Sequence, residues 1–393
     1  MTPILFAFAV AAFAGSRNDP IELVESFPEE SVLDHPDIRD SREVWLEMLA
    51  GAKRSLDIEE FYVCTEKGEP MEEVLDAVRS AARRGVKVRI VSDSKFHKTY
   101  PEPLDSLAKL ENVSVRFLDM EALAGGVMHA KYFIADGEHL FLGSQNFDWR
   151  SLKHIQELGL RVRDKAAAKP FEELFELDWA LAQDPAGERA RMVKRELKAP
   201  LEVGAVKLTP VFSPKGLIEY EGLWEEARLI ELIDSAKREV LVQVLTYSPV
   251  SRSGEFHPDL DNALRRAAAR GVEVRLIVSD WAKRPPEIHH LGSLAALPNV
   301  TVKLTAIPRH SKGYIPFARV QHAKFLVVDK DSAWLGSSNW SKDYFYASRN
   351  AGFIIQGKGL TAQLRRVFFS SWTGPYAERV DPAKSYEPPV TGD

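Results

Sequence analysis

Hydrophobic residues follow two periods along this chain, and segments of the two kinds alternate. Apolar residues at helical spacing predict helices in SREVWLEMLAGA, from Ser41, and in MEEVLDAVRSAARRG, which would end at Gly85. Alternating or continuous apolar runs predict strands in SLDIEEFYV, VKVRIVSD and VSVRFLD, with a further helix in PLDSLAKLEN. This alternation predicts an α/β fold in which helices flank a mixed central sheet.

The second half of the chain repeats the same order of elements. Its segments are EARLIELIDSAKR, EVLVQVLTYSP, DLDNALRRAAARG, VEVRLIVSD, LGSLAAL and VTVKLTA. The stretch RGVKVRIVSD (84–93) is nearly repeated as RGVEVRLIVSD (270–280). A repeat of this length indicates two copies of one domain rather than a solenoid. We therefore predict two pseudo-symmetric lobes, residues 20–190 and 205–380, with a linker within 184–204 and a disordered tail at 385–393.

Each half also carries one polar motif in an apolar hairpin, MHAKYFIADGEHLFLGSQN (128–146) and VQHAKFLVVDKDSAWLGSSNW (320–340). The spacing of His129, Lys131 and Asp136 equals that of His322, Lys324 and Asp329, and the same Gly-Ser-x-Asn follows, with Ser144 and Asn146 in the first copy and Ser337 and Asn339 in the second. In a single copy, a lysine on an edge strand and a structural histidine would explain the pattern. Its repetition at one spacing favours a functional site.

Strand geometry predicts how these side chains are arranged. Side chains alternate across a strand, so His129 and Lys131 share one face, as do His322 and Lys324. The two aspartates fall on the opposite face by strand parity. We expect them to orient the hairpins rather than to touch a substrate.

The residue types discriminate between a metal and an anion. Histidine suits zinc, but a protonated lysine has no lone pair to donate, and its charge repels a dication. Two ammonium groups, two asparagine amides and imidazole N–H groups suit a phosphate whose charge is spread over its oxygens. We therefore expect no metal and no cofactor, and we expect Asn146, Asn339, Ser144 and Ser337 to bind the phosphate with the lysines.

Two histidines allow a two-step displacement at phosphorus. One neutral imidazole attacks and forms a phosphohistidine, while the other, protonated, gives its proton to the leaving oxygen and then activates water. Glu157 lies 28 residues after His129, and Asn350 holds the corresponding place in the second copy. A carboxylate behind an imidazole fixes its tautomer. On that basis we expect Glu157 to support His129 as the nucleophile, with His322 as the acid.

Composition sets limits on the kind of protein. The 393 residues are 45% hydrophobic and 28% charged, which is typical of a globular protein of two domains. A formal net charge of −5 excludes a globally basic nucleic-acid binder, so any polyanion site must be local. Cys64 is the only cysteine, which excludes an intrachain disulfide and a cysteine metal cluster.

The N-terminus has a short apolar run, Ile4 to Ala14, that ends in Ala-Phe-Ala. It predicts a secretory signal over residues 1–14 and a secreted or periplasmic protein, although no Lys or Arg precedes the run. A cytoplasmic chain with an apolar end is the alternative. No segment reaches the length of a transmembrane helix.

A local cationic segment lies before and within the second motif. From Leu304 to Val328 there is no Asp or Glu, and the segment carries Arg309 and Lys312 with Tyr314 and Phe317 interleaved. Such a loop suits a single strand, with phosphates on the cations and bases on the rings. An ordinary solvated loop whose aromatic residues belong to the core is the alternative.

The paired H-x-K-x4-D motifs with G-S-x-N resemble those of the phospholipase D superfamily. LVESFPE, LGSQNFDWRSLKHIQELG, IPFARVQHAKFLVV and SSNWSKDYF further resemble the branch of the lysosomal phospholipases D three and four and the poxvirus envelope phospholipase-like proteins, over roughly 21–372. The resemblance implies a two-lobed fold with the site at the lobe interface, 5′-to-3′ exonuclease activity on single strands, metal independence, and His129 and His322 as the catalytic pair.

We therefore predict a phosphodiesterase, foremost a single-strand nuclease. A phospholipase D or phosphatidyl transferase acting on phospholipid headgroups is the alternative. The expected partner is accordingly a single-stranded nucleic acid or a phospholipid, and a homodimer is left open.

Overall fold

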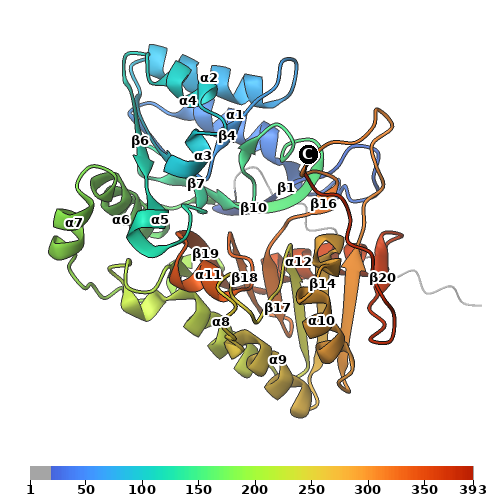
Figure 1. The fold of residues 1–393 in the computed structure, drawn as a ribbon. Coiled ribbons are helices and arrows are strands. Elements are labelled where there is room, and N and C mark those ends of the chain that lie inside the picture. Colours follow the sequence, from blue (N-terminus) through green and yellow to red (C-terminus); the bar gives the residue numbers. More distant parts are fainter. Residues whose placement is uncertain (1–18, 393) are drawn as a thin grey trace, which may run out of the picture.

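Each lobe contains one nine-stranded mixed sheet in the computed structural model, which describes residues 19–392 (Figure 1). The first sheet takes one of its nine strands from the second half of the chain. The strands of the first sheet are, in spatial order, β2 (Arg39–Asp40), β1 (Ile21–Ser26), β10 (Ile155–Arg163), β8 (His139–Gly143), β7 (Lys131–Ala135), β3 (Ser55–Glu60), β5 (Lys87–Asp93) and β6 (Val113–Leu118), with β16 (Val320–Gln321) paired to β10. The strands of the second are β11 (Leu201–Val203), β12 (Val206–Ser213), β19 (Asn350–Gln356), β18 (Ser332–Gly336), β17 (Phe325–Val328), β13 (Glu239–Val244), β14 (Glu273–Ser279), β15 (Val300–Thr305) and β20 (Ala377–Arg379). A small separate sheet pairs β4 (Val63–Cys64) with β9 (Phe147–Asp148).

The two sheets share one topology, which confirms the predicted repeat. The order β10-β8-β7-β3-β5-β6 in the first sheet corresponds to β19-β18-β17-β13-β14-β15 in the second. In each, three parallel strands continue into an antiparallel hairpin that carries the His-Lys motif. The predicted α/β class with mixed sheets and flanking helices is therefore correct.

Helices cover the sheets in both lobes. In the first half they are α1 (Ser41–Gly51), α2 (Met71–Arg83), α3 (Ser94–His97), α4 (Glu102–Leu107), α5 (Met120–Ala124), α6 (Lys165–Leu181) and α7 (Pro185–Arg191). In the second half they are α8 (Glu225–Asp234), α9 (Asp259–Ala269), α10 (Glu287–Ala295), α11 (Lys342–Tyr346) and α12 (Lys358–Thr373), with short 3₁₀ turns at Glu221–Leu223 and Asp280–Lys283. Local signals explain the boundaries: Asp40 caps α1 by accepting from the Arg42 N–H, and Gly85 follows α2 at φ 90°.

The central core is shared by the lobes. Helix α6 of the first lobe packs against strands of both sheets, and α12 of the second lobe contacts β1 as well as β17 and β18. Phe171 of α6 packs on Phe212 and Phe353 of the second lobe, with ring centroids 5.1 and 4.9 Å apart. Burial of these apolar faces holds the lobes together.

A buried ion pair also joins the lobes beside the motifs. Asp178 of α6 accepts from Nε and Nη2 of Arg349 at 2.7 and 2.6 Å, and both side chains are fully buried. The Arg349 Nη1 donates in addition to the Ser213 carbonyl at 2.9 Å. Arg349 directly precedes β19, so this pair fixes that strand against the first lobe.

Backbone pairing crosses between the lobes at two places. Strand β16 of the second lobe runs parallel to β10 of the first, with Ile155 opposite Val320 and Gln156 opposite Gln321. Met128 of the first lobe forms a parallel bridge with Arg349 of the second. Both crossings lie immediately before a motif histidine.

The structure bears on the linker and the tail predicted from the sequence. The predicted linker, 184–204, contains α7 and the edge strand β11. The tail at 385–392, expected to be disordered, lies against the 304–328 segment, where the Phe317 N–H donates to the Thr391 carbonyl at 2.8 Å and the Tyr314 hydroxyl to the Gly392 carbonyl at 3.1 Å. The predicted signal at 1–14 lies outside the described residues.

Within residues 19–392, none of the helices has the length and apolar character that crossing a bilayer requires.

Candidate active site

Each motif histidine is held by the backbone of the opposite lobe. The His129 N–H donates to the Arg349 carbonyl at 2.8 Å, and the His322 N–H donates to the Gln156 carbonyl at 2.8 Å. These bonds continue the two backbone crossings between the lobes. The predicted location of the site at the lobe interface follows directly from them.

The imidazole rings are also supported across the interface, and this corrects one expectation. Glu157 of β10 contacts His322, with its two carboxylate oxygens 2.9 and 2.8 Å from Nδ1. Asn350 of β19 contacts His129, with Oδ1 3.0 Å from Nδ1. We expected Glu157 to support His129 because both belong to the first lobe. That pairing is wrong, because the strand that carries Glu157 pairs with the strand that leads into His322.

The surroundings of Asn350 fix the tautomer of His129. Its Nδ2 donates to the Tyr344 and Ser348 carbonyls at 2.9 and 3.2 Å, so Oδ1 is the atom that faces the ring. The Ser337 hydroxyl donates to the same Oδ1 at 3.0 Å. An amide oxygen only accepts, so Nδ1 of His129 carries a hydrogen and Nε2 is left for substrate. The carboxylate of Glu157 imposes the same tautomer on His322.

The two lysines repeat one arrangement. Nζ of Lys131 donates to the carbonyl of His129 at 2.6 Å, and Nζ of Lys324 donates to the carbonyl of His322 at 2.6 Å. Both side chains are fully buried. Each ammonium keeps further N–H donors beyond that bond.

The motif aspartates lie at the far end of the hairpins. Asp136 accepts from the backbone N–H groups of Lys53, Arg54 and Ser55, and Asp329 accepts from those of Lys237, Arg238 and Glu239. Both adopt a positive φ, 58° and 53°, at the hairpin turn. They brace each turn against the start of a neighbouring strand, as strand parity predicted.

The Ser and Asn residues of the motifs take different positions. Both serine hydroxyls are buried. That of Ser144 donates to the Leu158 carbonyl and accepts from the Leu158 N–H. That of Ser337 donates to Oδ1 of Asn350 and accepts from the Ala351 N–H. Asn146 donates to the Tyr62 hydroxyl at 3.4 Å, while Asn339 donates to the Tyr344 hydroxyl at 3.1 Å and accepts from the Thr246 N–H at 3.3 Å. The serines thus support the groups behind the histidines, and direct phosphate contact by the four residues stays a prediction.

Comparisons with known proteins agree with this geometry. The family profile "Cardiolipin synthase, PLD-like domain" matches residues 45–179 and 229–372. The 5′-3′ exonuclease PLD3 of Bos taurus is 34% identical over 408 residues, which cover 93% of this chain and 82% of the bovine protein. The chain belongs to the phospholipase D superfamily. The 5′-3′ exonuclease PLD4 of Mus musculus is 31% identical over 402 residues, 91% of this chain and 79% of that protein.

Solved phospholipase D-type structures show the same fold at low sequence identity. Phosphatidylserine synthase of Haemophilus influenzae Rd KW20 superposes with a TM-score of 0.62 at 14% identity, over 86% of this chain and 85% of that one. Polyphosphate kinase from Porphyromonas gingivalis gives 0.56 at 13% identity, over 92% of this chain and 49% of that one. These likenesses support the two-lobed fold and carry no statement about substrate.

The candidate site places two lysines and two histidines close together in a buried setting, which suits an anion. Burial, with the Lys131 and Lys324 charges, holds the pKa of His129 well below its usual value, and burial and the same charges lower the pKa of His322. Burial lowers the pKa of Lys324 to about 7, and burial together with the Lys324 charge lowers the pKa of Lys131. Burial raises the pKa of Glu157 to about 7. A bound phosphate would raise the pKa values of all four cationic groups.

The predicted substrate loop is partly covered by the C-terminal tail. Tyr314 and Phe317 are 41% and 46% exposed, and the C-terminal tail contacts both. The guanidinium of Arg309 lies 5.6 Å from the Tyr314 ring centroid. The aromatic residues of the loop are thus outside the core, and its role in substrate binding stays a prediction.

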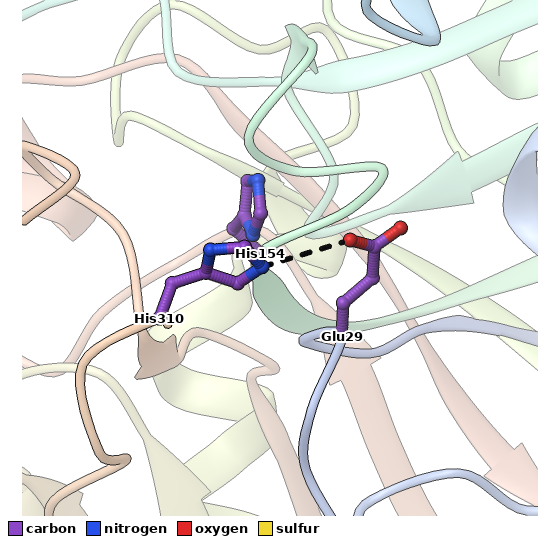
Figure 2. Close-up of side chains that lie close together, drawn as sticks. All are labelled: Glu29, His154 and His310. Atoms are coloured by element: carbon purple, nitrogen blue, oxygen red, sulfur yellow. Dashed lines mark ion pairs between the residues drawn. The ribbon is translucent and has the colours of Figure 1, made fainter. Parts of the chain in front are cut away.

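A second cluster of titratable groups lies at the lobe boundary. Glu29, His154 and His310 approach one another from three segments, as Figure 2 shows, with His310 Nε2 3.8 Å from a Glu29 oxygen. His310 Nδ1 accepts the Lys312 N–H at 3.2 Å, which leaves the proton of the neutral ring on Nε2, the atom that a metal would need. Arg319 also donates to the Glu29 carbonyl at 2.5 Å and brings a positive charge to the cluster. These contacts do not favour a cation.

Sequence reasoning missed the aromatic residues beside His129. The ring centroids of Phe61 and Tyr344 lie 5.0 and 5.1 Å from that of His129. Phe61 directly follows β3, and Tyr344 is in α11. Tyr344 lies within the segment SSNWSKDYF but was not singled out as a site residue, and Phe61 belongs to neither repeated motif. Only the fold brings the two rings to the histidine.

Proposed function

We propose that the protein is a metal-independent phosphodiesterase that shortens single-stranded nucleic acid from its 5′ end through a phosphohistidine intermediate. One observation carries the chemistry: two histidines, each oriented at Nδ1 by the opposite lobe, present Nε2 beside two buried lysines. The substrate class is supported by the relatives, which are named 5′-3′ exonucleases and match over nearly the whole chain.

The unequal partners of the histidines assign their roles. A carboxylate stabilises an imidazolium far better than a neutral amide does. The single proton that the pair must hold therefore resides on His322, next to Glu157, and His129, next to Asn350, is the neutral nucleophile. The roles are those expected from the sequence, but the reason is reversed: Glu157 acts by supporting the acid.

The first step forms the covalent intermediate. The Nε2 lone pair of His129 forms a bond to phosphorus as the bond from phosphorus to the leaving oxygen breaks. That oxygen takes the Nε2 proton of His322 and departs as an alcohol. Lys131 and Lys324 neutralise charge on the non-bridging oxygens.

The second step hydrolyses the intermediate. His322, now neutral, accepts a proton from water as the water oxygen attacks phosphorus. The bond between phosphorus and Nε2 of His129 breaks, and the pair returns to its starting protonation. Because every charge is supplied by these side chains, the proposed scheme requires no metal ion.

The experiment that tests this function compares nucleic acid and lipid on equal terms. Purified protein is incubated with 5′-labelled, 3′-labelled and end-blocked oligonucleotides, and separately with phosphatidylcholine and phosphatidylglycerol. We expect stepwise loss of nucleotides from the 5′ end and protection by a 5′ block. Headgroup release without oligonucleotide cleavage would instead establish the phospholipase or phosphatidyl transferase alternative.

We further propose a secreted or periplasmic location, on the apolar run at 4–14 alone. Intact-mass measurement of the exported protein, showing removal of residues 1–14, is the test. A homodimer stays a prediction that sedimentation would decide.

A further inference from the structure

Four aromatic side chains form a continuous row that begins at the nucleophile. Phe61 and Tyr62 follow β3, Phe96 lies in α3, and Tyr100 lies just beyond that helix. We call these residues the aromatic row. The row starts at Phe61, whose ring centroid is 5.0 Å from that of His129 and 4.9 Å from Nζ of Lys131.

The rings contact one another in sequence. Centroids of Phe61 and Phe96 are 4.1 Å apart, those of Phe96 and Tyr62 are 5.7 Å apart with planes at 21°, and those of Tyr62 and Tyr100 are 5.4 Å apart. All four side chains are only partly buried. Rings that served the core would be enclosed, as Phe133 and Phe141 are behind the same sheet. The aromatic row therefore keeps ring surface open next to the reaction centre.

The repeat shows that the fold does not require these rings. Strand β13 of the second lobe corresponds to β3, and the two residues that follow it are Leu245 and Thr246 in place of Phe61 and Tyr62. A residue needed for the stability of the lobe would be expected in both copies. The rings of the aromatic row thus distinguish the two sides of the site.

The far end of the aromatic row leads to the 304–328 loop. The Tyr62 hydroxyl donates to Asp148 at 2.8 Å, and Asp148 is paired with Arg150. Arg150 also contacts the Tyr100 hydroxyl at 3.5 Å and the Pro316 carbonyl at 3.4 Å. The rings therefore extend from His129 toward the loop that carries Tyr314 and Phe317.

We propose that the aromatic row is the base-binding subsite, on which nucleobases adjoining the scissile phosphate stack. This inference rests on the proposed function and adds the surface that selects a nucleic acid over other phosphodiesters. Every base has a π-face, so stacking on such rings tolerates any sequence. A glycerol headgroup has no such face, and a choline headgroup would contact the rings only as a cation, so dependence on the bases themselves marks a nucleic-acid subsite.

The test separates bases from backbone. Phe96 is the residue to change. It belongs to the aromatic row, and it is Phe61, not Phe96, whose ring packs on the His129 ring. Phe96→Leu removes the ring, and Phe96→Trp keeps one. Each variant is assayed on a single-stranded oligonucleotide and on the same oligonucleotide with abasic sites at its first three positions. Phe117→Leu, which removes a ring stacked on His97 of the same helix at 3.9 Å, is the matched control.

We expect wild-type protein and Phe117→Leu to prefer the base-bearing strand. Phe96→Leu should raise KM for that strand by roughly 5-fold to 100-fold, the loss of one stacking contact, and leave the abasic strand nearly unchanged. Phe96→Trp should restore the preference. Equal losses on both strands, or no loss on either, would overturn the inference while leaving the nuclease function intact. If wild-type protein cleaves neither strand, the proposed function itself fails.

Discussion

Glu157 and His322 belong to different lobes, yet both carboxylate oxygens of Glu157 lie within 2.9 Å of the imidazole Nδ1 of His322. Asn350 makes the reciprocal contact with His129 at 3.0 Å. The site is therefore close to twofold symmetric in geometry and asymmetric in charge.

Exchanging the partners of the histidines should shift opposite limbs of the pH profile. Glu157→Gln removes the charge that stabilises the His322 imidazolium, so kcat should fall by up to roughly 100-fold to 10,000-fold, the contribution of a general acid, and the alkaline limb should move to lower pH. Asn350→Asp places a charge behind His129, so the acidic limb should move to higher pH. Profiles of log kcat/KM for both variants provide the measurement. Movement of the same limb in both would refute the assigned roles.

The wild-type profile should be a bell with its optimum on the acidic side of neutrality. Burial raises the pKa of Glu157 to about 7 and lowers that of His322. Because the two groups are in contact they hold one proton between them, and the pair loses this proton as the pH rises. Burial lowers the pKa of Lys324 to about 7, so its charge is lost over the same range. The pKa of His129 lies well below the usual 6.5, so the nucleophile stays neutral in mild acid.

A better leaving group should change one side of that bell. A p-nitrophenyl ester needs little protonation, so the requirement for the His322 proton disappears and the alkaline limb of kcat/KM should become shallower. The part due to Lys324 should remain, as should the acidic limb. An alkaline limb of the same steepness for both leaving groups would exclude His322 as the acid.

The covalent adduct should form on His129. Acid quenching during turnover, followed by peptide mass spectrometry, should place the phosphoryl group on the peptide that contains His129. With a p-nitrophenyl ester, His322→Ala should still form this adduct and accumulate it, because the acid is dispensable for that leaving group but the base for hydrolysis is missing. An adduct found on His322 alone would reverse the two roles.

Chelation should not affect turnover. The groups that face the substrate are imidazoles and ammonium ions, and the charge of a buried lysine opposes a bound dication. Protein dialysed against EDTA should therefore retain full kcat with both oligonucleotide and p-nitrophenyl substrates. Loss of activity that zinc or magnesium restores would contradict the mechanism.

Breaking the buried ion pair between the lobes should be costly. Asp178→Ala leaves the Arg349 guanidinium charged and fully buried, and such changes destabilise proteins by about 3–5 kcal/mol. Asp234→Ala, which breaks a surface pair with Arg266, should cost less than about 1 kcal/mol and is the matched control. Urea unfolding monitored by tryptophan fluorescence would measure both. Equal effects would show that Asp178 does not carry a buried charge pair.

The sequence was sufficient for what depends on local spacing. The repeat and the hairpins follow from strand periodicity, and the structure agrees with them. Asp136 and Asp329 lie in the hairpin turns and hold them in place, which agrees with the structural role expected for them. The partner of Glu157 did not follow, because it depends on the register of β10 with β16, two strands from different lobes. The spacing of Glu157 from His129 within the first repeat contains no information about how strands of the two lobes pair.

The aromatic row escaped prediction for a related reason. Phe61 directly follows β3 and Phe96 lies in α3, which follows β5. They carry no motif spacing, and they meet only because β3 and β5 are neighbours in the sheet. Tyr314 and Phe317 stood out in the sequence because acidic residues are absent around them. Composition therefore pointed to the loop with Tyr314 and Phe317, whereas the rings that lie next to His129 could be found only from the topology of the sheet.

The backbone crossings at Met128–Arg349 and β10–β16 have a consequence for how catalysis can fail. Each histidine is held by a backbone carbonyl and by a side chain that the other lobe supplies, so neither half contains a working site of its own. Any event that undocks the lobes, whether heat, a distant mutation or a cut in the connecting segment, must silence both histidines together. The residual activity of a partly damaged sample is therefore proportional to the fraction of molecules whose lobes are still docked. We expect this activity to be lost in one step rather than two.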